Sequence, residues 1–270
     1  HEKLMRLFKN YTIIGGMPEI LENYSQNRDL TRLNNVYDSL LTAYMDDVEK
    51  YARNETLMKV IRHAISHSFY YPSERIAFEG FGKSRYKYRE MHEAFTTLEK
   101  AMLLQLAYPV TATRVPPKPN QKKRPKLQIL DTGLVNYYSG LGKVLYTSGK
   151  LEDVARGNIA EHITGQQLMA LTSSVLNKLH FWTREEKHSN AEVDFIYHYK
   201  DLIIPIEVKS GAKGRLRSLH QFMDKAPHPY AVRIYSGICS IEKAQAINKT
   251  QYYLLNLPFS LIYDFQLFFR

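Results

Sequence analysis

Cysteine and long apolar runs are almost absent from this sequence, and each absence excludes a class of protein. Cys239 is the one cysteine among 270 residues, so an internal disulfide and a zinc site made of four cysteines are both excluded. We therefore expect a reducing compartment, the cytoplasm, with Cys239 as a small buried hydrophobic residue. No apolar run approaches the ~20 residues that span a bilayer, so we expect no membrane partner.

Acidic residues are also scarce relative to basic ones. There are 37 Lys and Arg against 27 Asp and Glu, which leaves a net charge of +10. Such an excess favours a polyanionic partner such as DNA, although a solvated basic surface would give the same count. The first residues, HEKLMRLFKNY, have the pattern of the middle of a helix, so we expect the chain to be part of a longer protein.

The order of the patterns predicts a mixed α/β protein (α+β overall) in three parts. Residues 1–52 are predicted to be a helical segment. Residues 53–145 hold two predicted helices, near 55–69 and 85–101, followed by two strand-like runs joined by PPKPNQKKRP, which is the outline of a winged helix. Residues 146–270 alternate helix and strand around an antiparallel hairpin, which predicts an α/β domain with a mixed sheet.

The stretch EVDFIYHYKDLIIPIEVKSG, residues 192–211, predicts a β-hairpin with a two-residue turn at 200–201. If the hairpin is symmetrical, Asp194 faces Glu207 across the strands, with Cβ atoms about 5 Å apart. Lys209 lies on the same face as Glu207, because side chains two apart on a strand point the same way. Facing carboxylates weaken a hairpin by up to roughly 1 kcal/mol unless a cation lies between them.

Asp194 followed by Glu207-Val208-Lys209 is a pattern that suits metal-dependent cleavage of a phosphodiester. A Mg²⁺ or Mn²⁺ ion held by Asp194 and Glu207 would supply a deprotonated water and neutralise the phosphoryl oxygens. Lys209 would orient that water or stabilise the developing negative charge. Glu161, on the preceding predicted helix, would complete the metal-binding set. Two alternatives stay open: a solvated strand face with an ordinary salt bridge, and a site that binds without cleaving.

At Glu161, Asp194, Glu207 and Lys209 the sequence resembles the PD-(D/E)xK nuclease superfamily. A wider resemblance is to the C-terminal portion of prokaryotic AAA-type ATPases that carry an appended domain of unknown function. It is carried, in order, by GGMPEIL, LQILDTGL, GNIAEHITGQQL, FWTREEKHSNAEVDFIY and IPIEVKSG. The resemblance implies a winged helix and a restriction-endonuclease-like domain that follow an ATPase module. We expect that module to be a partner of this region, and ATP to bind only there.

Basic residues gather at the tip of the predicted wing, which holds Lys118, Lys122, Lys123, Arg124 and Lys126. As a wing this segment would lie along DNA phosphates, with Arg85 and Lys87 at the start of the recognition helix. Two alternatives stay open for this segment: a solvated loop whose charge keeps the protein soluble, and a surface that docks on the ATPase module.

Two other motifs point more weakly to a ligand. AFEGFGKS, residues 77–84, nearly matches a phosphate-binding loop, but Ala77 stands where the first glycine belongs, and we expect a turn there. His63 and His67 lie one helical turn apart, but the sequence offers no third metal ligand beside them.

Overall fold

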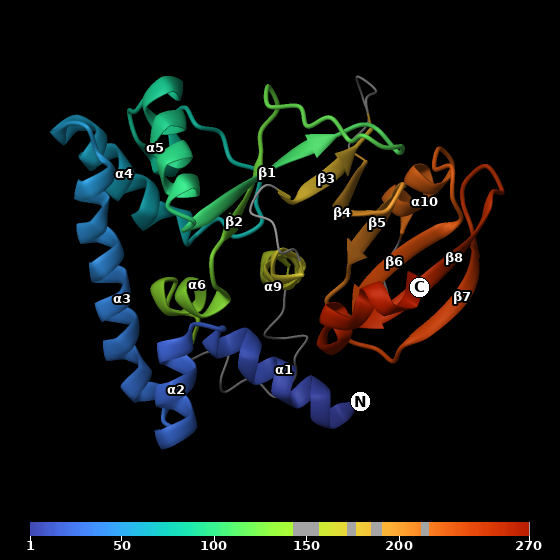
Figure 1. The fold of residues 1–270 in the computed structure, drawn as a ribbon, viewed down its shortest axis with the longest axis horizontal. Coiled ribbons are helices and arrows are strands. Elements are labelled where there is room, and N and C mark those ends of the chain that lie inside the picture. The colour runs from blue at the N-terminus through green and yellow to red at the C-terminus, as the bar shows by residue number, and fades with distance from the viewer. Residues whose placement is uncertain (143–156, 172–176, 185–190, 212–215, 270) are drawn as a thin grey trace.

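A computed structural model gives the arrangement of residues 1–142, 157–171, 177–184, 191–211 and 216–269 (Figure 1). The strands are β1 (Leu104–Val110), β2 (Lys126–Ile129), β3 (His180–Thr183), β4 (Glu192–Tyr199), β5 (Leu202–Val208), β6 (Tyr230–Tyr235), β7 (Ser240–Gln245) and β8 (Gln251–Pro258). They form one mixed sheet in the order β2-β1-β3-β4-β5-β6-β8-β7. The predicted α/β class with a mixed sheet is thereby confirmed.

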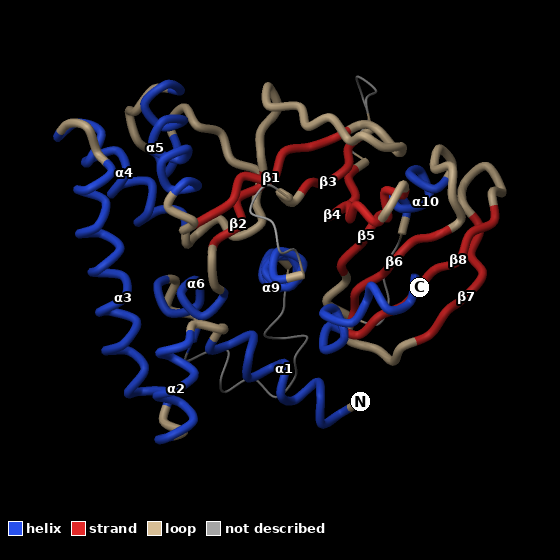
Figure 2. The backbone as a smooth tube through the Cα atoms, viewed as in Figure 1, coloured by secondary structure: helices blue, strands red, loops and turns tan. Residues whose placement is uncertain are grey.

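The helices lie mostly in the first half of the chain. They are α1 (Glu2–Ile14), α2 (Pro18–Asn27), α3 (Leu30–Tyr51), α4 (Glu55–Ser68), α5 (Tyr88–Lys100), α6 (Thr132–Tyr138), α9 (Asn158–Ala170) and α10 (Arg217–Met223), with the 3₁₀ helices η1 (Phe81–Lys83) and η2 (Phe259–Phe269). Figure 2 shows this mainly helical side, α1 to α6, next to the strands β3 to β8. No helix among the described residues is both long and apolar enough to cross a membrane.

The hairpin β1–β2 joins the helical side to the sheet. β1 pairs antiparallel with β2 and parallel with β3, so the hairpin with the basic tip is the first part of the eight-stranded sheet. A single apolar cluster under α1 to α6 takes in Ile13, Ile61, Phe95 and Leu127, and so joins the predicted segments 1–52 and 53–145. The limits of the three predicted domains stay a prediction.

Apolar helix faces cover both sides of the sheet. Ile163 of α9 packs with Phe181 and Ile206 on one side, where η2 also lies. Phe222 of α10 packs against Trp182 on the other side, with ring centroids 5.4 Å apart. Figure 1 shows α9 end-on, between the helical side and the strands. The predicted helix around GNIAEHITGQQL is therefore the element that connects the two parts, although its predicted beginning, within 146–156, lies outside the described residues.

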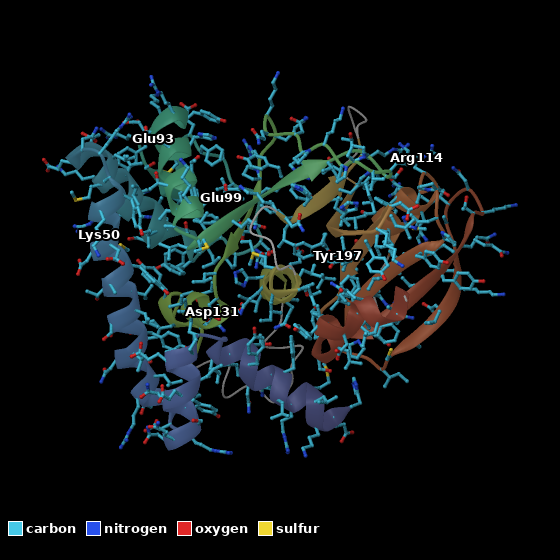
Figure 3. The ribbon with its side chains drawn as sticks, viewed as in Figure 1. Lys50, Glu93, Glu99, Arg114, Asp131 and Tyr197 are labelled. Carbon is cyan, nitrogen blue, oxygen red and sulfur yellow. The ribbon has the colours of Figure 1, made fainter. Side chains whose placement is uncertain are left out.

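Asp131 holds the corner between α1, α2 and α6 together (Figure 3). Its carboxylate is 2% exposed and accepts hydrogen bonds from the N–H groups of Gly16 at 2.6 Å and Gly133 at 2.8 Å. Gly15 has a φ of +74°, and a Cβ there would lie 1.9 Å from Oδ1 of Asp131. The first glycine of GGMPE is thus required by a contact with the aspartate of LDTG, more than a hundred residues later.

The two weaker motifs turn out to be one structural unit. AFEGFGKS forms a turn that contains η1, as predicted, and the His63 and His67 rings stack on each other at 4.0 Å beside it. His63 Nε2 lies 2.9 Å from the Phe81 carbonyl oxygen, so this histidine anchors the turn. The prediction for Cys239 is wrong, because the residue is exposed in the connection between β6 and β7, outside both apolar faces of the sheet.

Candidate functional site

Strands β4 and β5 form the predicted hairpin in the predicted register. Phe195 pairs with Ile206, and the pairing continues to the turn, where Lys200 adopts a φ of 54°. Beyond that ladder, the N–H of Val208 donates to Oδ2 of Asp194 at 2.8 Å. Asp194 therefore lies beside the end of β5, where Glu207 and Lys209 are found.

Glu207 is almost completely buried, with 5% of its surface exposed. Its Oε1 accepts a hydrogen bond from Lys209 Nζ at 2.7 Å. Its Oε2 has no hydrogen-bond partner among the described residues. Because a buried carboxylate oxygen without a partner is costly, a proton, a water or a cation at this atom would be stabilising.

Glu161 reaches the same place from the first turn of α9. Its Oε2 lies 2.9 Å from Nζ of Lys126, and that ammonium lies 3.8 Å from Oδ1 of Asp194. The structure therefore brings together Glu161, Asp194, Glu207 and Lys209, as the sequence predicted. Their roles in metal binding or catalysis stay a prediction.

Lys126 lies inside this site, which the sequence did not indicate. It is the first residue of β2, it is 5% exposed, and its Nζ also lies 2.7 Å from Oε1 of Glu192. The rings of Phe181 and Phe195 lie 5.2 and 5.9 Å from that nitrogen. The assignment of Lys126 to the basic wing is therefore wrong: the strand that starts here turns the side chain inward, while the residues at 122–124 are exposed.

Within the part of the chain that the structure describes, acidic groups outnumber basic ones at this site. We call Glu161, Glu192, Asp194 and Glu207 the carboxylate cluster, and the cations that pair with it are Arg75, Lys126 and Lys209. Arg75 pairs with Glu192 and lies over the Phe181 ring, 4.7 Å from its centroid. Among the described residues, four carboxylates therefore face three paired cations, a balance that would accommodate one more positive charge.

Burial and the neighbouring charges together shift the pKa values of this site. Burial raises the pKa of Asp194, and the charges of Glu207 and Glu161 raise it further. Burial also raises the pKa of Glu207, although Lys209 opposes the change. For Lys126, burial disfavours the ammonium, but the neighbouring carboxylates outweigh it and raise the pKa, so the side chain keeps its charge.

The donor atoms of the cluster are of the kind that Mg²⁺ and Mn²⁺ prefer, because carboxylate oxygens are hard ligands. The unpartnered Oε2 of Glu207 fits such an ion as well. Within the described ranges, however, no three His, Cys, Asp or Glu side chains are arranged as a metal-binding group. In this arrangement the ammonium of Lys126 lies between Glu161, Glu192 and Asp194.

The basic residues predicted to contact DNA are separate from the cluster. Lys122, Lys123 and Arg124 are exposed on the connection between β1 and β2, and Arg85 and Lys87 lie just before α5. None of the ion pairs of the cluster, within the part of the chain that the structure describes, includes one of these five. They form surface that is open to a partner.

Sequence reasoning missed Lys126, Glu192 and Arg75. A signal existed for Glu192, since it lies two positions before Asp194 on one strand and so shares its face. Lys126 and Arg75 come from strands and loops far away in the sequence, and the basic neighbours of Lys126 pointed to a solvated surface instead.

Two families of known proteins match this chain. Residues 5–144 match the family described as Domain of unknown function (DUF8612), and residues 156–258 match Domain of unknown function (DUF4143). The second is a domain typically found C-terminal to AAA ATPases. No curated protein and no solved structure matches the chain.

Proposed function

We propose that this chain is the C-terminal part of a cytoplasmic AAA-type ATPase. The premise is that the chain belongs to the DUF8612 family and continues into a region that matches DUF4143. In this proposal its sheet is a restriction-endonuclease-like domain of the PD-(D/E)xK kind, preceded by a winged helix. The carboxylate cluster is a site for a divalent cation that cleaves phosphodiester bonds in DNA. The observation that carries the proposal is the buried, unpartnered Oε2 of Glu207 beside Asp194 and Lys209, an absence of partners that holds among the described residues.

Each residue has a role that suits its position. Asp194, Glu207 and Glu161 would hold Mg²⁺ or Mn²⁺, and the bound ion would supply a water activated for attack on phosphorus. Lys209 is held by Glu207 and is partly exposed, so its ammonium can reach a phosphoryl oxygen. The apolar rings of Phe181 and Phe195 limit water around the cluster, which strengthens every charge interaction within it.

Binding of a metal can be tested by thermal melting. A cation that binds the folded cluster, but not the unfolded chain, stabilises the protein by about 2.7 kcal/mol at a hundredfold excess over its dissociation constant. We expect Mn²⁺ at millimolar concentration to raise the melting temperature of the wild type, and Asp194→Asn to remove most of that rise. No rise in the wild type would contradict a metal site that is accessible in this form of the protein.

Cleavage is tested on supercoiled plasmid with Mg²⁺ or Mn²⁺, with a chelator in parallel. We expect nicking by the wild type that is lost in Lys209→Ala. Lys243→Ala, which changes an exposed lysine of the edge strand β7, is the matched control and should cleave as the wild type does. Equal nicking by both variants would refute the catalytic role of Lys209.

DNA binding is the part of the proposal that rests on the exposed basic residues. Lys122, Lys123 and Arg124 would lie along phosphates, so binding should weaken steeply as salt rises. Neutralising all three should reduce the slope of log K against log salt by about 0.9 for each phosphate that these side chains neutralise. An unchanged slope would assign the loop to another partner, such as the ATPase module.

A second function is favoured by one observation, the ammonium of Lys126 at the centre of the carboxylates. If it stays there permanently, the cluster is a structural ion-pair network, and the domain recognises DNA or protein for the ATPase without cleaving. This alternative predicts that Mn²⁺ stabilises neither the wild type nor variants of Lys126, and that no preparation cleaves plasmid.

A further inference from the structure

One lysine links the two family regions of the chain. Lys126 belongs to the region that matches DUF8612, whereas Glu161, Glu192 and Asp194 belong to the region that matches DUF4143. Its ammonium lies 2.9 Å from Glu161, 2.7 Å from Glu192 and 3.8 Å from Asp194. A cation supplied by one part of the protein thus neutralises the candidate metal site of the other.

We propose that Lys126 is an internal cation that competes with a divalent metal for the carboxylate cluster, so that the site binds metal only when its ammonium is withdrawn. This inference rests on the proposed function, because it concerns the regulation of that same site. The structure then represents the closed state, in which Glu161 and Asp194 are held by the lysine.

The geometry makes the two cations mutually exclusive. Mg²⁺ requires its oxygen ligands at about 2.0–2.1 Å in octahedral geometry. The same Glu161 and Asp194 carboxylates here surround an ammonium nitrogen. An ion bound by both would lie within a few ångströms of Nζ, in a region closed by Phe181 and Phe195, where like charges are poorly screened.

The ammonium can leave without unfolding its strand. The backbone of Lys126 is paired with Ala107 of β1 and bridges to Arg75, so this end of β2 is fixed on both sides. The lysine side chain is long and unbranched, and rotation about its own bonds can carry Nζ away from the carboxylates. An anion bound at the protein surface next to the carboxylate cluster would favour that rotation, because the ammonium would exchange one set of anionic partners for another.

The orphan oxygen of Glu207 shows that the lysine does not satisfy the whole cluster. Glu207 Oε2 has no partner within the described residues, and Lys126 makes its close contacts with the other three carboxylates. Lys209 pairs with the other oxygen of Glu207, so Oε2 is a buried acceptor that a further cation could bind once the ammonium of Lys126 has left.

The test is a titration with Mn²⁺ alone, with free ion measured by electron paramagnetic resonance. Lys126→Met, which keeps most of the length and removes the charge, should bind Mn²⁺ at least tenfold more tightly than the wild type. Asp194→Asn added to it should abolish the gain. Lys178→Met is the matched control: Lys178 also forms an ion pair, with Glu99 at 2.7 Å, and its replacement should leave the dissociation constant unchanged.

A second variant covers the case in which Lys126→Met fails to fold without metal. Lys126→Met combined with Glu192→Gln removes one charge of each sign and keeps the proposed ligands, Glu161, Asp194 and Glu207. It should melt as a folded protein in chelator and gain more from Mn²⁺ than the wild type gains.

The outcomes separate this inference from the proposed function. Tighter Mn²⁺ binding in either variant supports competition by Lys126. Binding that depends on Asp194 but is equally tight with and without Lys126 overturns the competition and leaves the metal site intact. No binding by the wild type or by any Lys126 variant overturns the metal site, and the competition with it.

Discussion

Replacing Asp131 by Asn is the sharpest test of how the helical side is held together. Oδ2 accepts hydrogen bonds from the N–H of Gly16 at 2.6 Å and from Gln166 Nε2 at 3.1 Å. Oδ1 accepts from the N–H groups of Gly133 and Leu134, at 2.8 and 3.3 Å. Four donors from three separate segments converge on one buried carboxylate.

The size of the effect follows from this count. Asparagine offers one oxygen, so whichever way its amide turns, two of the four donors face an NH₂ group. A buried donor without an acceptor costs about 1–3 kcal/mol. On each carboxylate oxygen one of the two hydrogen bonds is longer and weaker than the other, so we expect a loss of about 2–4 kcal/mol in the free energy of unfolding. Against a typical total of about 5–15 kcal/mol this is a large fraction.

Urea unfolding measures the loss directly. Trp182 is the one tryptophan and is 1% exposed, so its fluorescence reports the core of the sheet, while circular dichroism follows the helices. Asp264→Asn makes the same chemical change at an exposed site and should stay within about 0.5 kcal/mol of the wild type. A loss below about 1 kcal/mol in Asp131→Asn would refute the idea that this carboxylate joins the segments.

Two further predictions concern stability. Gly133→Ala would place a Cβ 2.2 Å from the Ile14 carbonyl oxygen, so calorimetry should show a loss of about 3 kcal/mol in the free energy of unfolding, despite the better helix propensity of alanine. Gly211→Ala should change this free energy little, because no atom of the described residues lies within 4 Å of the added Cβ. Burial lowers the pKa of His228, although the Ile203 carbonyl and nearby Asp201 oppose the shift, and its Nδ1 accepts a backbone N–H at 3.2 Å. The folded state therefore binds this proton less readily than the unfolded state. The contribution of His228 to the free energy of unfolding is complete above pH ~6.5, and it decreases as the pH falls below ~6.5, by up to about 1.4 kcal/mol per pH unit. Urea midpoints from pH ~7.5 to ~5 should fall less steeply in His228→Gln, and identical slopes would contradict the assignment.

Local patterns in the sequence are enough to predict the features that depend on neighbours along the chain. Alternating apolar residues and a two-residue turn were enough for the β4–β5 hairpin and its register, and therefore for placing Asp194 beside Glu207. The helices α4 and α5 followed from helical periodicity, because Val60, Ile61 and Ala64 recur on one face. The strands β7 and β8 and the helix α6 were not predicted individually, since short elements carry too little pattern to distinguish them from loops.

Tertiary structure alone decided which distant groups share a site. Lys126 looked like one of several basic residues on a loop, but the pairing of β2 with β1 and the packing of α9 turn it toward Glu161 and Glu192. The apolar character of Cys239 predicts a core position, but the residue is exposed because its segment lies outside the apolar faces of the sheet. Local patterns encode which residues share a face of one element. Packing between elements far apart in the sequence then decides which of these faces meet. The same packing decides whether a charged side chain between two elements is solvated or is buried among opposite charges.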